Sequence, residues 1–161
     1  MTESSQKIEQ TWETPTHDEI AELTRAHVQA MESMDVDEVW QQAGMHHVLL
    51  RTIGRKTGNE HKVALPYWTD PDGKRIVVAS FAGSDRHPSW FANLADRTKN
   101  PEVLVKVQDG EFWSVPEILE GDEYDRTWAM LVADRAWYTD YQKRTERKIP
   151  LVRLPETRPA T

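Results

Sequence analysis

Apolar residues between positions 17 and 34 recur every three or four residues, which is the period of one face of an α-helix. Just before this pattern, Thr16 and Glu19 have the spacing of a capping box, in which each side chain bonds the backbone N–H of the other residue. The pattern predicts an amphipathic helix over 17–34 whose buried face is formed by Ile20, Leu23, His27, Ala30, Met31 and Met34.

From His46 onward, short apolar runs bounded by turn residues predict strands. The first three runs follow one another closely, which favours antiparallel pairing, because parallel strands need long crossovers. Pro66 within the second run indicates an edge strand or a bulge. We expect about six strands, at 46–53, 62–69, 74–80, 103–107, 112–119 and 149–154.

Further helices are predicted between the strands, from Pro88 to about residue 96, from Gly121 onward and around 138–145. Pro88 suits the first turn of a helix, where its missing N–H costs nothing. Antiparallel strands with helices inserted between them and at both ends define an α+β fold. A small β-barrel would remove the exposed edges of such a sheet.

We expect the chain to divide at residue 40, with an acidic N-terminal arm and the amphipathic helix in 1–40 and the β-domain in 41–161. Residues 1–15 are polar and end in Thr14-Pro15, so we expect a flexible arm that ligand binding does not need. The tail over 155–161, which contains two prolines, is also expected to be loose.

The net charge of −7 is unevenly distributed. Residues 1–40 hold 10 acidic and 2 basic side chains, whereas residues 41–161 hold 17 acidic and 18 basic ones. A general nucleic-acid-binding protein usually has a domain-wide basic excess, so we expect no nucleic-acid partner. No apolar run approaches the roughly 20 residues that span a bilayer, and the polar N-terminus does not resemble a signal peptide, which predicts a cytoplasmic protein.

The chain has no cysteine, which excludes disulfides and thiolate chemistry. His46 and His47 are adjacent, so in a strand they point to opposite faces and cannot bind one metal ion together. The serines lack the context of a nucleophile elbow. We therefore expect neither a metal site nor a catalytic triad.

The turn GRKTG at 54–58 brings Arg55 and Lys56 together between two glycines. Glycines let backbone N–H groups converge, and basic side chains add positive charge, which is how phosphate and carboxylate groups are held. A solvated hairpin tip would use the same residues, and residue types alone do not decide between the two. The spacing is neither that of a Walker A loop nor that of a dinucleotide-binding fingerprint.

A second candidate segment covers 77–94, where a strand ends at Ser80, a glycine-containing loop follows, and a helix carries Trp90. Ligands often bind where strand ends meet the N-terminus of a helix, because free backbone donors point there. For Trp90, anchoring in the core is the favoured interpretation. For Ser80, Ala82 and Gly83 the residue chemistry leaves both a ligand contact and a plain connection open.

A third candidate segment follows Trp137. Tyr138 and Tyr141 are three residues apart, so both face one side of a helix, where phenols at a pocket mouth can donate hydrogen bonds. Core packing explains these rings equally well.

Several motifs occur in a fixed order: GRKTG after an apolar strand, ALPYW in the next strand, VVAS followed by AG and HPxW, NPEVxV, and YxxYQxRTxRxIPLV near the C-terminus. In combination they resemble the deazaflavin-dependent nitroreductase family, over about residues 48–154. Members of this family are oxidoreductases that use coenzyme F420, a 5-deazaflavin. The resemblance therefore implies a mostly antiparallel split β-barrel over 41–161 that binds F420.

The resemblance also assigns individual residues. Contacts to the phosphate and oligoglutamate tail of F420 are implied for Arg55, Lys56, Thr57, Gly58 and Lys62. Contacts beside the deazaflavin ring are implied for Leu65, Pro66, Tyr67, Ser80, Phe81, Ala82 and Gly83, and the HPxW signature corresponds to His87, Pro88 and Trp90. The substrate side is implied for Tyr138 and Tyr141. Many members have Tyr-Pro where this chain has Arg135-Ala136, which should alter the pocket wall.

From this resemblance we expect an F420H2-dependent reductase that transfers a hydride to a flat conjugated acceptor, such as a quinone, a nitroaromatic compound or an α,β-unsaturated ester or lactone. Tyr138 or Tyr141 would hydrogen-bond the acceptor. Two alternatives stay open: an FMN-dependent oxidoreductase on the same barrel, and a non-catalytic F420 carrier in which Trp137 or Trp40 covers the ring. A quinone acceptor would also suit a weak peripheral association with the inner face of the cell membrane.

Overall fold

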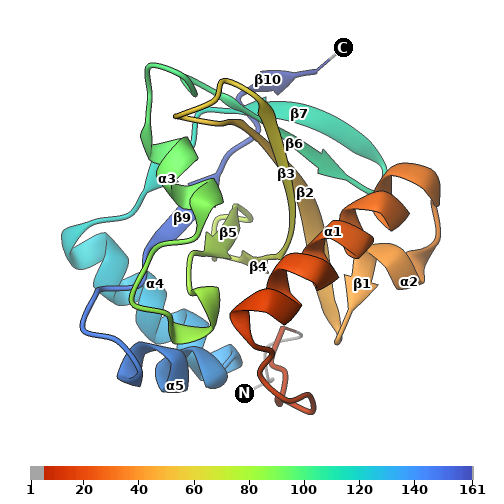
Figure 1. The fold of residues 1–161 in the computed structure, drawn as a ribbon. Coiled ribbons are helices and arrows are strands. Elements are labelled where there is room, and N and C mark those ends of the chain that lie inside the picture. The colour runs from red at the N-terminus through yellow and green to blue at the C-terminus, as the bar shows by residue number, and fades with distance from the viewer. Residues whose placement is uncertain (1–5, 161) are drawn as a thin grey trace.

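The computed structural model describes residues 6–160, which form two antiparallel β-sheets flanked by helices (Figure 1). The helices are α1 (His17–Ser33), α2 (Asp37–Trp40), α3 (Ser89–Ala95), α4 (Gly121–Asp134) and α5 (Trp137–Lys143), with a 3-10 turn, η1, at Phe81–Gly83. The strands are β1 (Gln41–Gln42), β2 (Met45–Ile53), β3 (Glu60–Pro66), β4 (Trp68–Thr69), β5 (Arg75–Val78), β6 (Val103–Val107), β7 (Gly110–Ser114), β8 (Glu117–Ile118), β9 (Leu151–Leu154) and β10 (Arg158–Pro159).

The larger sheet has the strand order β1-β2-β6-β7-β10, and β3 pairs with β2 beside this row. The smaller sheet has the order β4-β5-β9-β8. The chain crosses from the larger sheet to the smaller one twice, at Tyr67 between β3 and β4 and at 115–116 between β7 and β8. The predicted α+β class with mostly antiparallel strands is confirmed, and the described strands form two sheets instead of one closed barrel.

The described residues contain ten strands where about six were predicted. The predicted runs 62–69 and 112–119 each divide because the chain changes sheets within them, and β1 and β10 were not predicted. Pro66 ends β3, which among the described strands pairs only with β2, so the proline does mark an edge strand.

Three groups of buried apolar side chains hold these layers together. The first joins both sheets to α3 and includes Val48, Leu50, Val77, Leu94, Val105 and Val152. The second packs α4 and α5 against the smaller sheet and includes Ile76, Leu131, Tyr138, Tyr141 and Leu151. The third attaches α1 and α2 to β2 and consists of Val28, Met31, Val39, Trp40 and Leu49. Helix α1 contributes two buried side chains to this group, Val28 and Met31. Because each large apolar side chain that is fully buried stabilises the fold by about 1.5–3 kcal/mol, α1 accounts for a small share of the core.

The predicted capping box of α1 is confirmed. The backbone N–H of Glu19 donates to Thr16 Oγ1 at 3.2 Å, and the backbone N–H of Thr16 donates to Glu19 Oε1 at 3.2 Å. The predicted buried face is partly wrong, because Leu23 is 59% exposed and Met34 is 48% exposed. Met31 is buried as predicted, and Val28, which the prediction left out, is buried as well.

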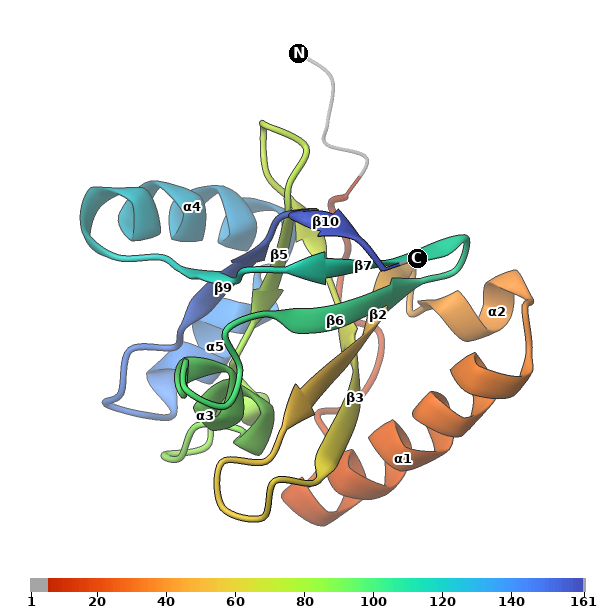
Figure 2. The ribbon, with the colours of Figure 1, turned by 90° about the horizontal axis from the view of Figure 1, so that it is seen from above.

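Helix α1 runs beside β3 at the edge of the larger sheet (Figure 2). The backbone N–H of Ala64 points away from β2 and donates to Thr24 Oγ1 at 3.1 Å. Near the C-terminus of α1, Glu32 forms an ion pair with Lys62 at 2.6 Å. An uncovered strand edge can pair with another chain, and here α1 covers part of that edge.

The expectation of a flexible N-terminal arm is wrong for residues 6–15, while residues 1–5 lie outside the described residues. Gln6 exchanges two side-chain hydrogen bonds with the backbone of Thr69, at 2.6 and 2.8 Å. The backbone N–H of Ile8 donates to the carbonyl oxygen of Asp134 at 2.9 Å, and Trp12 packs on Trp137. Ile8 and Trp12 thus anchor an otherwise polar segment. Two isolated apolar residues show neither a helical nor a strand period, so the sequence pattern did not predict this.

The expectation of a loose C-terminal tail is also wrong. Strand β10 pairs with β7, where Arg158 lies opposite Trp113. Thr157 donates its backbone N–H to the carbonyl oxygen of Trp113 at 2.9 Å, and Arg158 pairs with Glu102. The prolines of the tail do not prevent this, because β10 forms a short edge of the sheet.

Within residues 6–160, no helix is long and apolar enough to cross a membrane. The same residues contain no group of three or more His, Asp or Glu side chains placed to hold a metal ion.

Candidate functional site

A cavity of about 970 Å³ opens among α1, β3, η1, α3 and α5. Its wall also includes Trp12 and Pro15 from the N-terminal segment and Met45 and His47 from β2. Cofactor and small-molecule pockets are typically about 300–1,000 Å³ in volume, mostly apolar, and carry a few polar groups. The size of this cavity and its aromatic wall suit a ligand with a flat conjugated ring.

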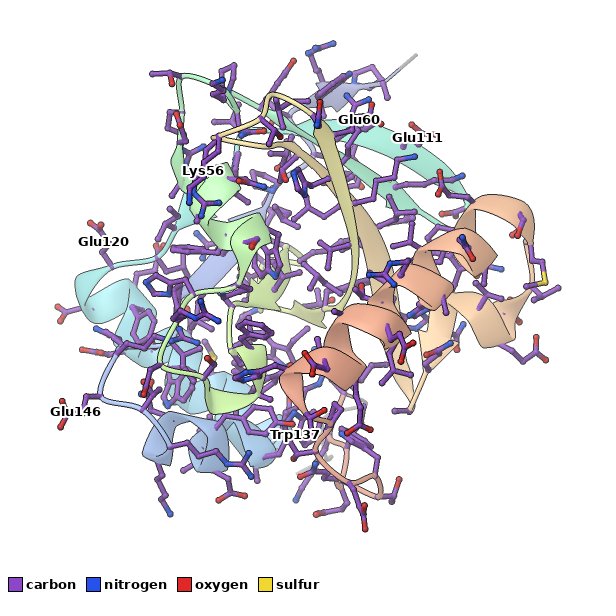
Figure 3. All side chains as sticks on the ribbon, viewed as in Figure 1. Lys56, Glu60, Glu111, Glu120, Trp137 and Glu146 are labelled. Atoms are coloured by element: carbon purple, nitrogen blue, oxygen red, sulfur yellow. The ribbon has the colours of Figure 1, made fainter. Side chains whose placement is uncertain are left out.

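Aromatic side chains form the end of the cavity at α5. Trp12 meets Trp137 edge to face with ring centroids 5.0 Å apart. Tyr138 lies 5.3 Å from Trp137 and 6.0 Å from Tyr141, again between ring centroids. Trp137 is labelled at the lower end of Figure 3, beside α5. Because Tyr138 and Tyr141 both belong to the buried core and line the cavity, core packing and pocket lining are not alternatives here.

The Tyr138 hydroxyl is held in its protonated form. Burial raises the pKa of Tyr138 to about 12, although the nearby Arg135 guanidinium acts in the opposite direction. A protonated phenol can donate a hydrogen bond at neutral pH. A donor whose pKa lies so far above the operating pH transfers its proton poorly, so Tyr138 is suited to hydrogen-bonding an acceptor oxygen and not to giving up its proton.

The turn η1 has an unusual backbone. Phe81, Ala82 and Gly83 have φ angles of 44°, 53° and 82° in succession. This left-handed region costs roughly 1–2 kcal/mol for a residue with a Cβ, so the surrounding structure must enforce it. Strained backbone of this kind clusters at functional sites, and the side chains of Phe81 and Ala82 line the cavity.

Arg147 supplies much of the support for this turn. Its guanidinium donates to the carbonyl oxygens of Ala79, Ser80 and Ser84 at 3.2, 2.8 and 2.7 Å. It also donates to His87 Nδ1 at 3.1 Å. One side chain thus binds the segment on both sides of η1.

Gly83 brings η1 into direct contact with α5. A Cβ at this position would lie 2.7 Å from the carbonyl oxygen of Tyr141 and 2.8 Å from Arg144 Cδ. The glycine is therefore required both by its φ angle and by the close approach of the backbone.

Two buried asparagines, Asn93 and Asn100, hold the GRKTG loop and the preceding end of β2 through hydrogen bonds. Asn100 Oδ1 accepts from the backbone N–H of Ile53 at 2.7 Å, and Asn100 Nδ2 donates to the carbonyl oxygens of Ile53 and Asn93 at 2.8 Å each. Asn93 Oδ1 accepts from the backbone and the guanidinium of Arg55 at 3.2 and 2.8 Å. Arg55 is therefore directed into the protein by Asn93.

The basic residues near this loop differ in availability. Lys56 is exposed and forms no ion pair or hydrogen bond with any residue of 6–160, and Figure 3 labels it in front of or beside α3. Lys62 is engaged by Glu32 of α1, and the hydrogen bond from the Lys62 ammonium to this carboxylate raises the pKa of Lys62. An anion at Lys62 would have to compete with Glu32, whereas an anion at Lys56 would not.

The structure divides the predicted site residues into two sets. Those that line the cavity are Lys62, Leu65, Pro66, Ser80, Phe81, Ala82, Pro88, Trp90, Tyr138 and Tyr141. Those outside its lining are Arg55, Lys56, Thr57, Gly58, Tyr67, Gly83 and His87. Trp137 lines the cavity and Trp40 does not.

Contacts with other residues keep Tyr67 and His87 out of the cavity lining. The Tyr67 ring stacks with His46 and with the guanidinium of Arg75, and its carbonyl oxygen accepts from Arg135 Nη1 at 2.9 Å. His87 lies at the surface between Arg147 and Phe91, and partial burial together with the Arg147 charge lowers its pKa.

Several residues of the site were missed by sequence reasoning. Trp12 lies in a segment without periodicity, His47 was considered only as a metal ligand, and Arg147 was quoted within the C-terminal motif without being given a role. Asn100 begins the NPEVxV motif and Asn93 lies in the helix predicted after Pro88, but neither was given a role. Their roles depend on contacts with residues far away in the sequence, which leave no local trace.

The chain matches the sequence model of the F420H(2)-dependent quinone reductase family over residues 23–156. An F420H(2)-dependent quinone reductase of Mycobacterium tuberculosis is 36% identical over 110 residues, which cover 66% of this chain and 71% of that protein. A second, putative one from the same organism is 32% identical and covers 66% of this chain and 87% of that protein.

Solved structures agree with these sequence matches. An F420-H2 dependent reductase is similar with a TM-score of 0.56 and 34% identity, covering 68% of this chain and 93% of that chain. A protein solved as a domain-swapped dimer has a TM-score of 0.57 and 29% identity, covering 82% of this chain and 100% of that chain. By its sequence over residues 23–156 and by these relatives, the chain belongs to the F420H(2)-dependent quinone reductase family.

Proposed function

We propose that this protein binds reduced F420 and passes a hydride to a quinone or a similarly flat conjugated acceptor. The observation that carries the proposal is the cavity of about 970 Å³, whose wall combines β3, η1 and Trp90 on one side with Tyr138 and Tyr141 on another. Family membership gives the cofactor class, and the aromatic wall fits both a deazaflavin and a planar acceptor.

The residues present fit such a cofactor. We assign the ring to the part of the cavity lined by Leu65, Pro66, Ser80, Phe81, Ala82, Pro88 and Trp90, with Tyr67, Gly83 and His87 supporting it from behind. The anionic tail is assigned to the loop residues Lys56, Thr57 and Gly58, with Arg55 and Lys62 at its margins. Gly58 has a φ of +75° and open space around its Cα, so a ligand can approach its backbone closely.

When bound, F420H2 supplies a hydride donor, and the protein contributes binding and orientation. Trp12 and Trp137 line one end of the cavity and contact each other edge to face. We assign the Tyr138 and Tyr141 hydroxyls to hydrogen bonds with an acceptor oxygen, which would stabilise the negative charge that develops there. The Tyr141 hydroxyl also lies 3.4 Å from Thr14 Oγ1. Because the Tyr138 phenol keeps its proton, the proton that completes reduction would come from solvent.

The proposal is tested by fluorescence titration with F420 and, in parallel, with FMN, followed by single-turnover reduction of a naphthoquinone. We expect saturable F420 binding and oxidation of F420H2 that depends on the quinone. Tight binding of FMN alone would instead support an FMN-dependent oxidoreductase. Tight F420 binding without quinone reduction would support a carrier, with Trp137 over the ring.

Replacement of Lys56 by alanine is expected to weaken F420 binding about 10- to 150-fold, because a charge-assisted hydrogen bond contributes about 1.5–3 kcal/mol. The melting temperature should stay unchanged, since Lys56 is exposed and forms no ion pair or hydrogen bond with another residue of 6–160. The loss should shrink in high salt, because ions screen exposed charges over about 10 Å at 0.1 M. An unchanged dissociation constant at low salt would remove Lys56 from the site.

Replacement of Tyr138 or Tyr141 by phenylalanine is expected to lower turnover of a naphthoquinone about tenfold, equivalent to about 1.4 kcal/mol, with F420 affinity unchanged. The Tyr138 effect should be constant between pH 6 and pH 9, because the pKa of about 12 keeps the phenol protonated throughout. Changes in melting temperature with wild-type turnover in both variants and in the double variant would assign the hydroxyls to core packing.

A quinone that partitions into lipid would require the protein to reach the bilayer surface, so we also propose a weak peripheral association with the inner face of the cell membrane. Sedimentation with anionic vesicles, with and without an incorporated quinone, tests it. Protein that stays in the supernatant in both cases would reject it.

A further inference from the structure

His47 is a buried histidine at the inner wall of the cavity. It is 9% exposed and lies on β2 opposite Pro66. Its neighbour His46 points to the other face of the strand and is exposed. His47 is therefore a polar side chain set among apolar wall residues, and the proposed function above gives it no role.

The hydrogen bonds of His47 determine which ring nitrogen carries its proton. His47 Nδ1 lies 2.9 Å from the carbonyl oxygen of Met45, and a carbonyl oxygen can only accept, so Nδ1 is the protonated nitrogen. In the neutral ring Nε2 then has a free lone pair. Nε2 forms no hydrogen bond with any residue of 6–160. The atom is not completely buried, so its lone pair borders the open space of the cavity.

The surroundings keep this ring neutral. Burial, together with the nearby ring of His27 and the Arg135 guanidinium, lowers the pKa of His47 to about 4. The two rings lie 4.9 Å apart, and the contact of His27 Nε2 with the carbonyl oxygen of Val39 at 2.5 Å uses the proton of His27. Arg135 is 3% exposed and held on the carbonyl oxygen of Tyr67, so its charge is fixed nearby.

We propose that His47 Nε2 is a hydrogen-bond acceptor for an N–H or O–H group carried on a flat conjugated ring in the cavity. The inference deepens the proposed function, because it selects among planar ligands. Tyr138 and Tyr141 offer donors to a ligand oxygen, whereas His47 offers an acceptor, so the wall recognises a ring that bears both kinds of group. That ring could be the deazaflavin, through its ring N–H or hydroxyl, or an acceptor substrate with a phenolic O–H.

Three variants test whether the lone pair of His47 Nε2 accepts a hydrogen bond from a ligand. His47→Leu removes it, and His47→Gln keeps an amide oxygen that can accept at a similar reach. His46→Leu is the matched control on the same strand, because it removes an imidazole from the exposed face. Melting temperatures of all three identify any variant that fails to fold. If His47→Leu does so, His47→Phe, which keeps a ring but has no lone pair, replaces it in the comparison.

Two binding measurements distinguish the source of the donor. The first is the dissociation constant for F420 by fluorescence. The second is the ratio of dissociation constants for 2-naphthol and 2-methoxynaphthalene, measured without cofactor, since these probes differ in a single O–H. A neutral hydrogen bond and the cost of leaving its partner unpaired correspond to about a tenfold effect.

We expect His47→Leu, but neither His47→Gln nor His46→Leu, to lose about tenfold in one of these measurements. A loss of F420 affinity assigns the donor to the cofactor, and a loss of the preference for 2-naphthol assigns it to the substrate. If His47→Leu equals His46→Leu in both, the inference is overturned. Failure of the wild-type protein to bind F420 would overturn the proposed function instead, and the naphthol measurement would still decide the role of His47.

Discussion

Replacement of Arg147 by methionine is expected to lower the free energy of unfolding by about 3 kcal/mol, because three backbone carbonyl oxygens and His87 lose a charged donor. In a chain of this length, that corresponds to a decrease of about 6–12 °C in melting temperature. The strained backbone of η1 would relax, since this side chain holds both of its flanks. We therefore expect weaker F420 binding as well, measured by fluorescence titration.

Lys143→Met is the matched control, because it removes a positive charge from α5 at an exposed position. It should leave both the melting temperature and the F420 affinity at their wild-type values. A variant at Arg147 that melts like the control would mean that η1 keeps its shape without the guanidinium.

Replacement of Asn100 by alanine is expected to destabilise the protein by about 2–4 kcal/mol. Asn100 is fully buried, and its loss leaves the N–H and the carbonyl oxygen of Ile53 without their Asn100 partners. It also removes one of two hydrogen bonds to the carbonyl oxygen of Asn93, which still accepts from the backbone N–H of Asp96. Each unsatisfied buried group costs about 1–3 kcal/mol. Because Asn93 in turn holds Arg55, the GRKTG loop should become more mobile, which faster amide hydrogen exchange over 53–59 would detect.

Asn59→Ala tests whether any asparagine near this loop has the same effect. Asn59 is exposed, and its side chain forms no hydrogen bond with the described residues. Urea unfolding of the two variants should separate them by more than 1.5 kcal/mol. Equal midpoints would show that the buried network contributes little.

The features that sequence reasoning predicted correctly have local causes. The capping box of α1 joins two residues three apart, and the turn before β7 depends on a short run of turn residues. Pro66 marked the edge position of β3 because a proline lacks the N–H that an inner strand needs. The family motifs likewise pointed to β3, η1 and α5, and the cavity draws part of its wall from each.

The features that were missed depend on long-range contacts. Trp12 was assigned to a flexible arm because residues 1–15 are mostly polar and end in Thr14-Pro15, yet its partner Trp137 belongs to α5. The tail that forms β10 was called loose because of its prolines, but its partner strand β7 lies far earlier in the chain. Leu23 was placed on the buried face of α1, but it is exposed. Periodicity predicts that a helix has an apolar face, but it does not determine which residues of that face the sheet edge covers.

The cavity wall begins at Trp12 and ends at Tyr141, with β3 and η1 between them in the sequence. A nascent chain emerging from the ribosome cannot complete this wall until α5 has been synthesised, so cofactor capture must follow the synthesis of α5. Free ligand then adds stability only to chains that have finished folding, by about 2.7 kcal/mol when its concentration is 100 times the dissociation constant. In a cell that lacks the cofactor, newly made chains would therefore stay more exposed to proteolysis than in a cell that makes it.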